Sequence, residues 1–138
     1  MTRETPILRL LVMLLSLLVV ARCGNCKEKV VSSQRAGDFE IAVHHRICGS
    51  VSGYNVSIAP PGMNLVGRSD QYEPFMMECC YDLGVPPPHP VEARLASATS
   101  VVIRFDAARA WTIVKQRPTQ GTFNIVYEPY GTPRTKTK

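Results

Sequence analysis

The sequence lacks the motifs that usually mark an enzyme or a nucleic-acid-binding domain. It contains no Gly-x-Ser-x-Gly turn that would present a nucleophilic serine, and no glycine-rich loop that would bind phosphate. Glu73, Glu78 and Asp82 cluster in a loop-like stretch, where solvated carboxylates are commoner than an acid–base pair. Basic residues do not gather with interleaved aromatic residues, as nucleic-acid binding would require. We therefore predict a non-catalytic protein with no cofactor, no small-molecule ligand and no nucleic-acid partner.

The chain also lacks an apolar run long enough to span a membrane comfortably. Leu10 to Ala21 is apolar except for Ser16, and a helix of that length rises about 18 Å at about 1.5 Å per residue. A hydrocarbon core of about 30 Å needs about 20 residues. Two arginines and one glutamate precede the run, which completes the layout of a secretory signal. We interpret residues 1–22 as an export signal rather than a transmembrane anchor.

Two processing routes remain open at the end of this signal. Val19 and Ala21 are small residues at −3 and −1, so a signal peptidase could cut before Arg22. Cys23 instead occupies the place of the acylated cysteine of a bacterial lipoprotein, although Arg22 departs from the small residue usual before it. We favour lipidation of Cys23, which places the protein at the periplasmic face of a bacterial membrane. Free secretion is the alternative.

Cysteine parity supports lipidation, because the chain has five cysteines and acylation of one leaves four for two disulfides. The four are Cys26, Cys48, Cys79 and Cys80. Adjacent cysteines in an extended segment alternate sides, so Cys79 and Cys80 are expected to reach different partners. We predict that Cys48 pairs with one of them and Cys26 with the other, which would staple a long loop to the sheet.

Hydrophobic periodicity predicts an all-β fold, either an antiparallel meander or a small β-sandwich. From Gly37 to Cys48 apolar residues alternate with polar ones, with the odd-numbered residues 39 to 47 on one face. Further strands are predicted at 54–59, 100–105, 110–115 and 121–128, separated by glycine and proline signals. Outside the export signal we find no helical period and no internal repeat.

The predicted domain organisation is a linker with a possible edge strand at 23–36, a β-domain at 37–131 and a basic tail at 132–138. Residues 63–90 read as a long loop, with one short element expected at 73–80. From Cys23 onward the chain carries 13 basic and 10 acidic side chains. Three of the basic ones lie in the tail, so the folded part is close to neutral.

The stretch DFEIAVHHRICGSVSGYNVSIAPPG, residues 38–62, resembles a pattern of small exported and lipoprotein-type proteins of bacteria. Their pattern reads Ala-Val-x-x-Arg-x-Cys-Gly, then an aromatic residue followed by Val-x-Ile. The matching positions are Ala42, Val43, Arg46, Cys48, Gly49, Tyr54, Val56 and Ile58. ATSVVIRFD and FNIVYEP resemble the C-terminal strands of the same group. The resemblance implies an exported β-domain and supplies no catalytic residues.

Histidine, cysteine and methionine also occur close together, but strand geometry argues against a metal site. His44 and His45 would point to opposite faces of a strand. His44 and Cys48 share a face but lie about 13 Å apart along it, so one ion cannot bridge them. Cysteines of an exported protein also favour disulfides. A copper- or zinc-handling protein is therefore the least favoured reading.

The sequence predicts a protein that acts by binding, with another envelope protein as its partner. The contact surface is expected in the 63–90 loop, because loops carry binding residues and aromatic and thioether side chains gather there. The candidate contact residues are Tyr72, Phe75, Met76, Met77 and Tyr81. The equal alternative is that these side chains fill the core of the domain. A secreted inhibitor or immunity-type protein that blocks an envelope enzyme is the second functional hypothesis.

Overall fold

The computed structural model describes residues 26–49, 51–65, 69–81 and 88–133. Within them the elements are β1 (Cys26–Ala36), β2 (Phe39–Cys48), β3 (Val51–Ala59), α2 (Ser69–Tyr72), β4 (Phe75–Tyr81), β5 (Val91–Ser97), β6 (Ser100–Asp106), β7 (Ala110–Gln116), β8 (Thr119–Gln120) and β9 (Phe123–Tyr130). No helix among these residues is long and apolar enough to cross a membrane. The predicted export signal, the lipidation site Cys23 and most of the basic tail lie outside the described residues.

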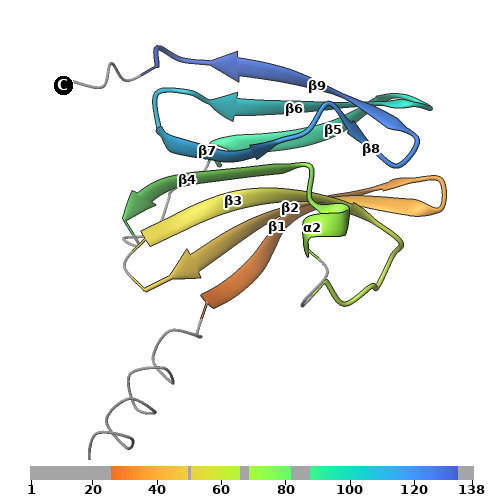
Figure 1. Cartoon of the computed structure of the whole chain (residues 1–138), viewed down its shortest axis with the longest axis horizontal. Helices are drawn as coiled ribbons and strands as arrows, with labels where there is room; N and C mark the ends of the chain where they lie inside the picture. Colours follow the sequence, from red (N-terminus) through yellow and green to blue (C-terminus); the bar gives the residue numbers. More distant parts are fainter. Residues whose placement is uncertain (1–25, 50, 66–68, 82–87, 134–138) are drawn as a thin grey trace, which may run out of the picture.

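The strands form two sheets that face each other as a β-sandwich (Figure 1). One sheet has the order β1-β2-β3-β4-β7 and the other the order β5-β6-β9-β8. β6 and β9 run parallel, and every other pairing between the described strands is antiparallel. The chain leaves the second sheet after β6, adds β7 to the first sheet and returns, which makes the fold a sandwich rather than a simple meander. The predicted all-β class is confirmed.

The core lies between the sheets and uses every second residue of the central strands. Ile41 and Val43 of β2 point into it, as the alternation predicted, and both are 1% exposed. They pack in one cluster with Val101 and Ile103 of β6. Phe75 bridges the two sheets, because its ring centroid lies 5.2 Å from that of Phe105 on β6. Aromatic contacts of this kind add to the stabilisation from area burial.

The N-terminal segment of the described chain belongs to the sandwich and is not a linker. β1 is an 11-residue edge strand that pairs with β2 from Cys26 opposite Cys48 to Ala36 opposite Phe39. Most of its side chains are exposed, and its register shifts between Val30 and Ser32. A polar, bulged edge strand has no regular alternation, which explains why the sequence indicated only a short strand there. The sandwich therefore includes the described chain from Cys26 onward.

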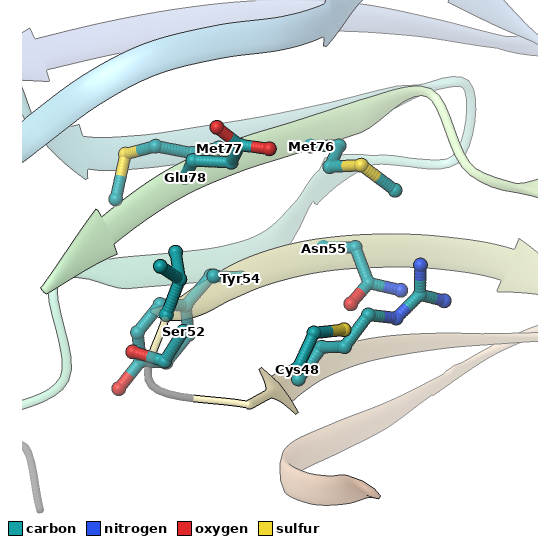
Figure 2. Close-up of a pocket in the computed structure, with 10 residues that line it drawn as sticks. Cys48, Ser52, Tyr54, Asn55, Met76, Met77 and Glu78 are labelled. Atoms are coloured by element: carbon teal, nitrogen blue, oxygen red, sulfur yellow. The ribbon is translucent and has the colours of Figure 1, made fainter. Parts of the chain in front are cut away.

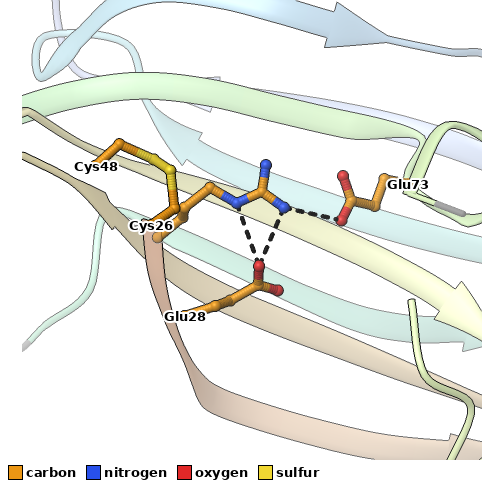
Figure 3. Close-up of a disulfide and its surroundings, with 5 residues drawn as sticks. Cys26, Glu28, Cys48 and Glu73 are labelled. Carbon is orange, nitrogen blue, oxygen red and sulfur yellow. Dashed lines mark hydrogen bonds and ion pairs between the residues drawn. A yellow bond between two sulfur atoms is a disulfide. The ribbon is translucent and has the colours of Figure 1, made fainter. Parts of the chain in front are cut away.

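The predicted disulfide pairing is wrong, because Cys26 is bonded to Cys48 (Figure 3). The two residues are direct partners in the β1–β2 register, and their Cα atoms lie 4.3 Å apart. Neither can therefore pair with Cys79 or Cys80 on β4, which β3 separates from β2. Cys79 is buried in the core, and the side chain of Cys80 lies outside the described residues. The predicted staple between Cys48 and the long loop is thus absent.

Hydrogen bonds hold the described part of the long loop in place. Lys115 Nζ donates to Asp70 Oδ1 at 2.9 Å, and Arg117 donates to the Asp70 carbonyl oxygen. Gln120 donates to the carbonyl oxygen of Gln71. Side chains on β7, on β8 and in the turn between them therefore fix α2, which precedes β4. The short element predicted at 73–80 is confirmed as β4.

Replacement of Cys26 and Cys48 together by serine is expected to lower the free energy of unfolding by about 3 kcal/mol, since the bond closes a loop of 22 residues in sequence separation. Urea denaturation measures the loss, and far-ultraviolet circular dichroism should show that the strands remain. Non-reducing peptide mapping of the parent protein is the control. Recovery of Cys48 linked to a β4 peptide would contradict the register.

Candidate binding site on the outer face of the five-stranded sheet

The five-stranded sheet has an outer face that points away from the second sheet, and the centre of this face, on β2 and β3, is buried rather than solvated. On β2, Ala42 is 4% and His44 9% exposed; on β3, Asn55 is 1% and Ser57 3% exposed. Alternation had predicted that Ala42 and His44 face water, as on a half-buried strand. α2 contacts β3 and lies on this side of the sheet (Figure 1). The connection between β3 and β4 therefore covers polar residues that must find partners within the protein.

His44 links two of these polar groups. Its Nδ1 lies 2.9 Å from Glu28 Oε1 on β1, and its Nε2 lies 2.7 Å from Ser57 Oγ on β3. The order carboxylate, imidazole, hydroxyl is that of a hydrolase triad. A nucleophile must meet its substrate, but Ser57 is buried and does not line the neighbouring pocket. The geometry therefore supports a structural role, in which three polar groups satisfy one another.

Arg46 is the centre of a second set of contacts. Its Nε and Nη2 donate to Glu28 Oε2 at 3.2 and 3.0 Å, and its Nη2 lies 3.6 Å from Glu73 Oε1 (Figure 3). Asn55 Nδ2 donates to the same Glu73 oxygen at 2.7 Å. Four segments of the chain thus meet here: β1, β2, β3 and the residue that follows α2.

The pKa values of the two carboxyl groups beside Arg46 are shifted in opposite directions. The hydrogen bond from His44, with help from Arg46, lowers the pKa of Glu28 to about 2 and outweighs the effect of burial. Burial is the largest influence on Glu73 and raises its pKa, although Arg46 and Asn55 act against it. Glu73 is 1% exposed, so desolvation of its charged form dominates. Glu28 therefore stays negatively charged to lower pH than Glu73 does.

Two buried acceptor atoms have no hydrogen-bond partner in the described part of the chain: Asn55 Oδ1 and Glu73 Oε2. A buried acceptor without a donor destabilises the folded protein by about 1 to 3 kcal/mol. Both atoms belong to side chains that use their other polar atom within the cluster. Both atoms are enclosed by the protein, so their missing hydrogen bonds are a cost that the folded cluster carries.

A pocket of about 160 Å³ opens beside this cluster. The labelled side chains in Figure 2 come from the end of β2, from β3 and from β4. Arg46, Gly53, Asn55, Met76 and Glu78 are among its lining residues. A Cβ atom on Gly53 would lie 2.7 Å from the Met77 carbonyl oxygen, so β3 and β4 approach more closely there than another residue would allow. The pocket is smaller than the roughly 300 to 1,000 Å³ of sites that enclose whole ligands.

The residues predicted as a binding surface are separated by the fold. Phe75 and Met77 are fully buried in the core, as the alternative reading of this stretch predicted, and Met77 also lines the pocket. Met76 is half-buried and lines the pocket. Tyr72 is half-buried in α2 and is not among the lining residues of the pocket, while the side chain of Tyr81 lies outside the described residues.

Sequence reasoning missed Glu28, Arg46, Asn55 and Glu73 as members of a site. The available signal was a run of polar residues at alternate positions on two neighbouring strands, 44 and 46 on β2 and 55 and 57 on β3. Alternation alone places such residues on a solvated face. Their burial depends on the β3–β4 connection, and no local pattern reports that contact.

Histidines do not converge on a metal site in the described ranges. His45 stacks on Tyr54 with ring centroids 4.7 Å apart, while His44 binds Glu28 and Ser57 on the outer face. The prediction that adjacent histidines face opposite ways agrees with these contacts. Within residues 26–49, 51–65, 69–81 and 88–133, no group of three or more His, Cys, Asp or Glu residues could hold a metal ion.

Comparisons with known proteins found no matching family model, no matching curated protein and no matching solved structure. The resemblance to small exported bacterial proteins stays a prediction. Several of its motif residues have evident structural roles. Arg46 binds two carboxylates, Cys48 forms the disulfide, and Gly49 adopts a φ of 66° in the turn after β2.

Glu28→Gln is expected to make the protein less stable at neutral pH, because it removes the charge that binds His44 and Arg46. The folded-state pKa of Glu28, about 2, lies below its ordinary value of 4.5. The stabilisation is therefore complete above about pH 4.5 and is lost as the pH falls through 2. Urea denaturation of both proteins across this range should show their difference shrinking toward acid.

Glu92→Gln is the matched control for this experiment. Glu92 is exposed on β5, and its contact with Arg104 is a long surface pair of 3.9 Å. The control should change stability little at any pH. A Glu28→Gln difference of constant size from neutral pH to pH 2 would contradict the assigned charge interaction.

Proposed function

We propose that this protein is an exported bacterial β-domain, tethered to a membrane through Cys23, that binds another envelope protein and performs no catalysis. The observation that carries the proposal is the exposed disulfide between Cys26 and Cys48. Reducing compartments keep such thiols apart, whereas the periplasm and the cell exterior oxidise them. The secretory layout of residues 1–22 supports the same compartment.

The pocket supports action by binding. Its volume of about 160 Å³ suits part of a partner better than a whole ligand. Ser57, which has the hydrogen bonds of a nucleophile, has no access to a substrate. The arrangement therefore favours recognition over chemistry.

Cys26, three residues after the proposed anchor, lies at the same end of the sandwich as the pocket. Cys26 begins β1 and is bonded to Cys48, which lines the pocket. Cys23 precedes Cys26 by three residues, and an extended chain of that length reaches about 10 Å. A lipid on Cys23 would thus hold the pocket near the membrane surface, where an envelope partner would meet it.

Intact mass measurement of the protein from bacterial membrane and soluble fractions tests the tether. We expect a membrane-bound chain that starts at Cys23 and carries a diacyl or triacyl mass increment. Cys26 and Cys48 should resist alkylation until a reductant is added. A soluble, unmodified chain starting at Arg22 would contradict lipidation and favour the secreted inhibitor.

Site-specific photo-crosslinking in intact cells tests binding at the pocket. Val51 lines the pocket and is 37% exposed, so it accepts p-benzoylphenylalanine at the rim. Val126 on the other sheet is 46% exposed and provides the matched control. We expect a discrete adduct from position 51 and none from position 126. Equal adducts from both positions, or adducts from 126 alone, would contradict the assigned site.

A further inference from the structure

We infer that oxidation of Cys26 and Cys48 completes the site around Arg46 and the pocket, so that the chain acquires this binding surface only after a disulfide-donating oxidant has acted on it. The inference rests on the proposed export and binding, and it specifies how the same site is controlled. Three features of the described residues carry it: the attachment of β1, the contribution of its first half to the site, and the exposure of the two cysteines.

The two halves of β1 are attached to the rest of the protein in different ways. The register shift between Val30 and Ser32 divides them. In the second half, Ala36 is 6% exposed and belongs to the core, and Gln34 Oε1 accepts a hydrogen bond from a backbone amide of β5 at 3.1 Å. In the first half, residues 26–30 are all exposed. The first half can therefore leave the sheet without opening the core.

The first half of β1 is held to β2 by backbone pairing, by Glu28 and by the disulfide. Glu28 Oε1 lies 2.9 Å from His44 Nδ1, and Glu28 Oε2 accepts hydrogen bonds from Arg46 Nε and Nη2 at 3.2 and 3.0 Å. The disulfide joins the first residue of β1 to the last residue of β2 (Figure 3). Exposed pairing at the end of an edge strand opens easily. The covalent bond therefore decides whether Glu28 stays beside Arg46.

Opening of this first half would dismantle the site. Arg46 and Cys48 both line the pocket, so one of its walls belongs to the part of β2 that pairs with residues 26–30. Of the two carboxylates beside it, Arg46 would then keep only Glu73, which lies 3.6 Å away. Both the charge at this wall and the support for the end of β2 would change. A partner that recognises the assembled site would therefore bind the oxidised chain better than the reduced one.

Both cysteines are exposed, so an oxidant can reach them in the folded sandwich. The reaction is a thiol–disulfide exchange, in which one cysteine thiolate attacks the disulfide of the oxidant and the second thiolate resolves the mixed disulfide. The S–S bond between Cys26 and Cys48 forms, and the oxidant takes up two electrons and two protons and leaves as a dithiol. The enzyme class that supplies this step is a thiol oxidase that donates its own disulfide.

A double-mutant cycle on the full-length protein tests the inference. The effect of Glu28→Gln on urea denaturation is measured at neutral pH in the parent and in the Cys26→Ser/Cys48→Ser variant. We expect the loss caused by Glu28→Gln to disappear almost entirely in the disulfide-free variant, since Glu28 has already left Arg46 there. Gln34→Ala, beyond the register shift, is the matched control and should cost the same in both backgrounds. An equal cost of Glu28→Gln in both backgrounds would overturn the inference.

Hydrogen exchange of the parent protein gives a second readout that needs no variant to fold. The protein is reduced with dithiothreitol and then reoxidised with oxidised glutathione. On reduction, the paired amides of residues 27–30 should exchange about tenfold faster or more, whereas those of residues 33–36 and of β3 stay protected. Reoxidation should restore the slow exchange. Unchanged exchange at residues 27–30, or loss of protection throughout both sheets, would overturn the inference.

The inference and the proposed function fail separately. In cells, the crosslink from position 51, normalised to the amount of protein, should fall several-fold in the Cys26→Ser/Cys48→Ser variant. If it persists at the parent level, the partner site stands and the control by oxidation is wrong. If reduction opens the first half of β1 but the parent gives no crosslink in cells, the control by oxidation stands and the envelope partner is wrong.

Discussion

Burial of the Glu73 carboxyl group is the constraint on which the outer face of this protein depends. The group is 1% exposed and would be strongly disfavoured as an isolated charge. Asn55 donates a hydrogen bond to it and Arg46 places a positive charge 3.6 Å away, and Arg46 is held in turn by Glu28 on the edge strand. Because Glu73 lies two residues before the start of β4, these contacts also fix how the chain returns to the sheet. The long β3–β4 connection is therefore anchored by charge and hydrogen bonds, without the disulfide that the cysteine spacing had indicated.

The Cys26–Cys48 disulfide supports the same group of contacts around Arg46. It joins the start of β1 to the end of β2, and β1 is an exposed edge strand with little apolar surface to bury. An edge strand of this kind frays easily. Covalent closure keeps Glu28 beside His44 and Arg46, so the bond contributes to the site as well as to stability. The opposite pKa shifts of Glu28 and Glu73 follow from one difference: Glu28 has two cationic or donor neighbours, whereas Glu73 is dominated by desolvation.

Prediction from sequence succeeded where the physical signal is local. β2 and β6 bury alternate apolar residues against the second sheet, and period-two alternation reports that burial directly. It indicated β1 only as a possible edge strand, because the polar side chains of β1 carry no such signal. It failed at the disulfide, which depends on a register between strands. Phe75 and Met77 were ambiguous for the same reason: an irregular apolar stretch can serve a surface or a core, and only the position of β4 between β3 and β7 decides.

The sequence alone determined the all-β class, the positions of most strands, the absence of recognisable catalytic motifs and the expectation of export, because each of these is written in composition or short-range periodicity. The tertiary structure alone decided which cysteines are bonded, that the outer face of β2 is buried at Ala42 and His44 as well as the inner one, and that residues from four separate segments gather around Arg46. These features depend on contacts between residues far apart in the chain. A site made of one carboxylate from β1, one guanidinium from β2, one amide from β3 and one buried carboxyl before β4 has no signature in any single stretch of sequence.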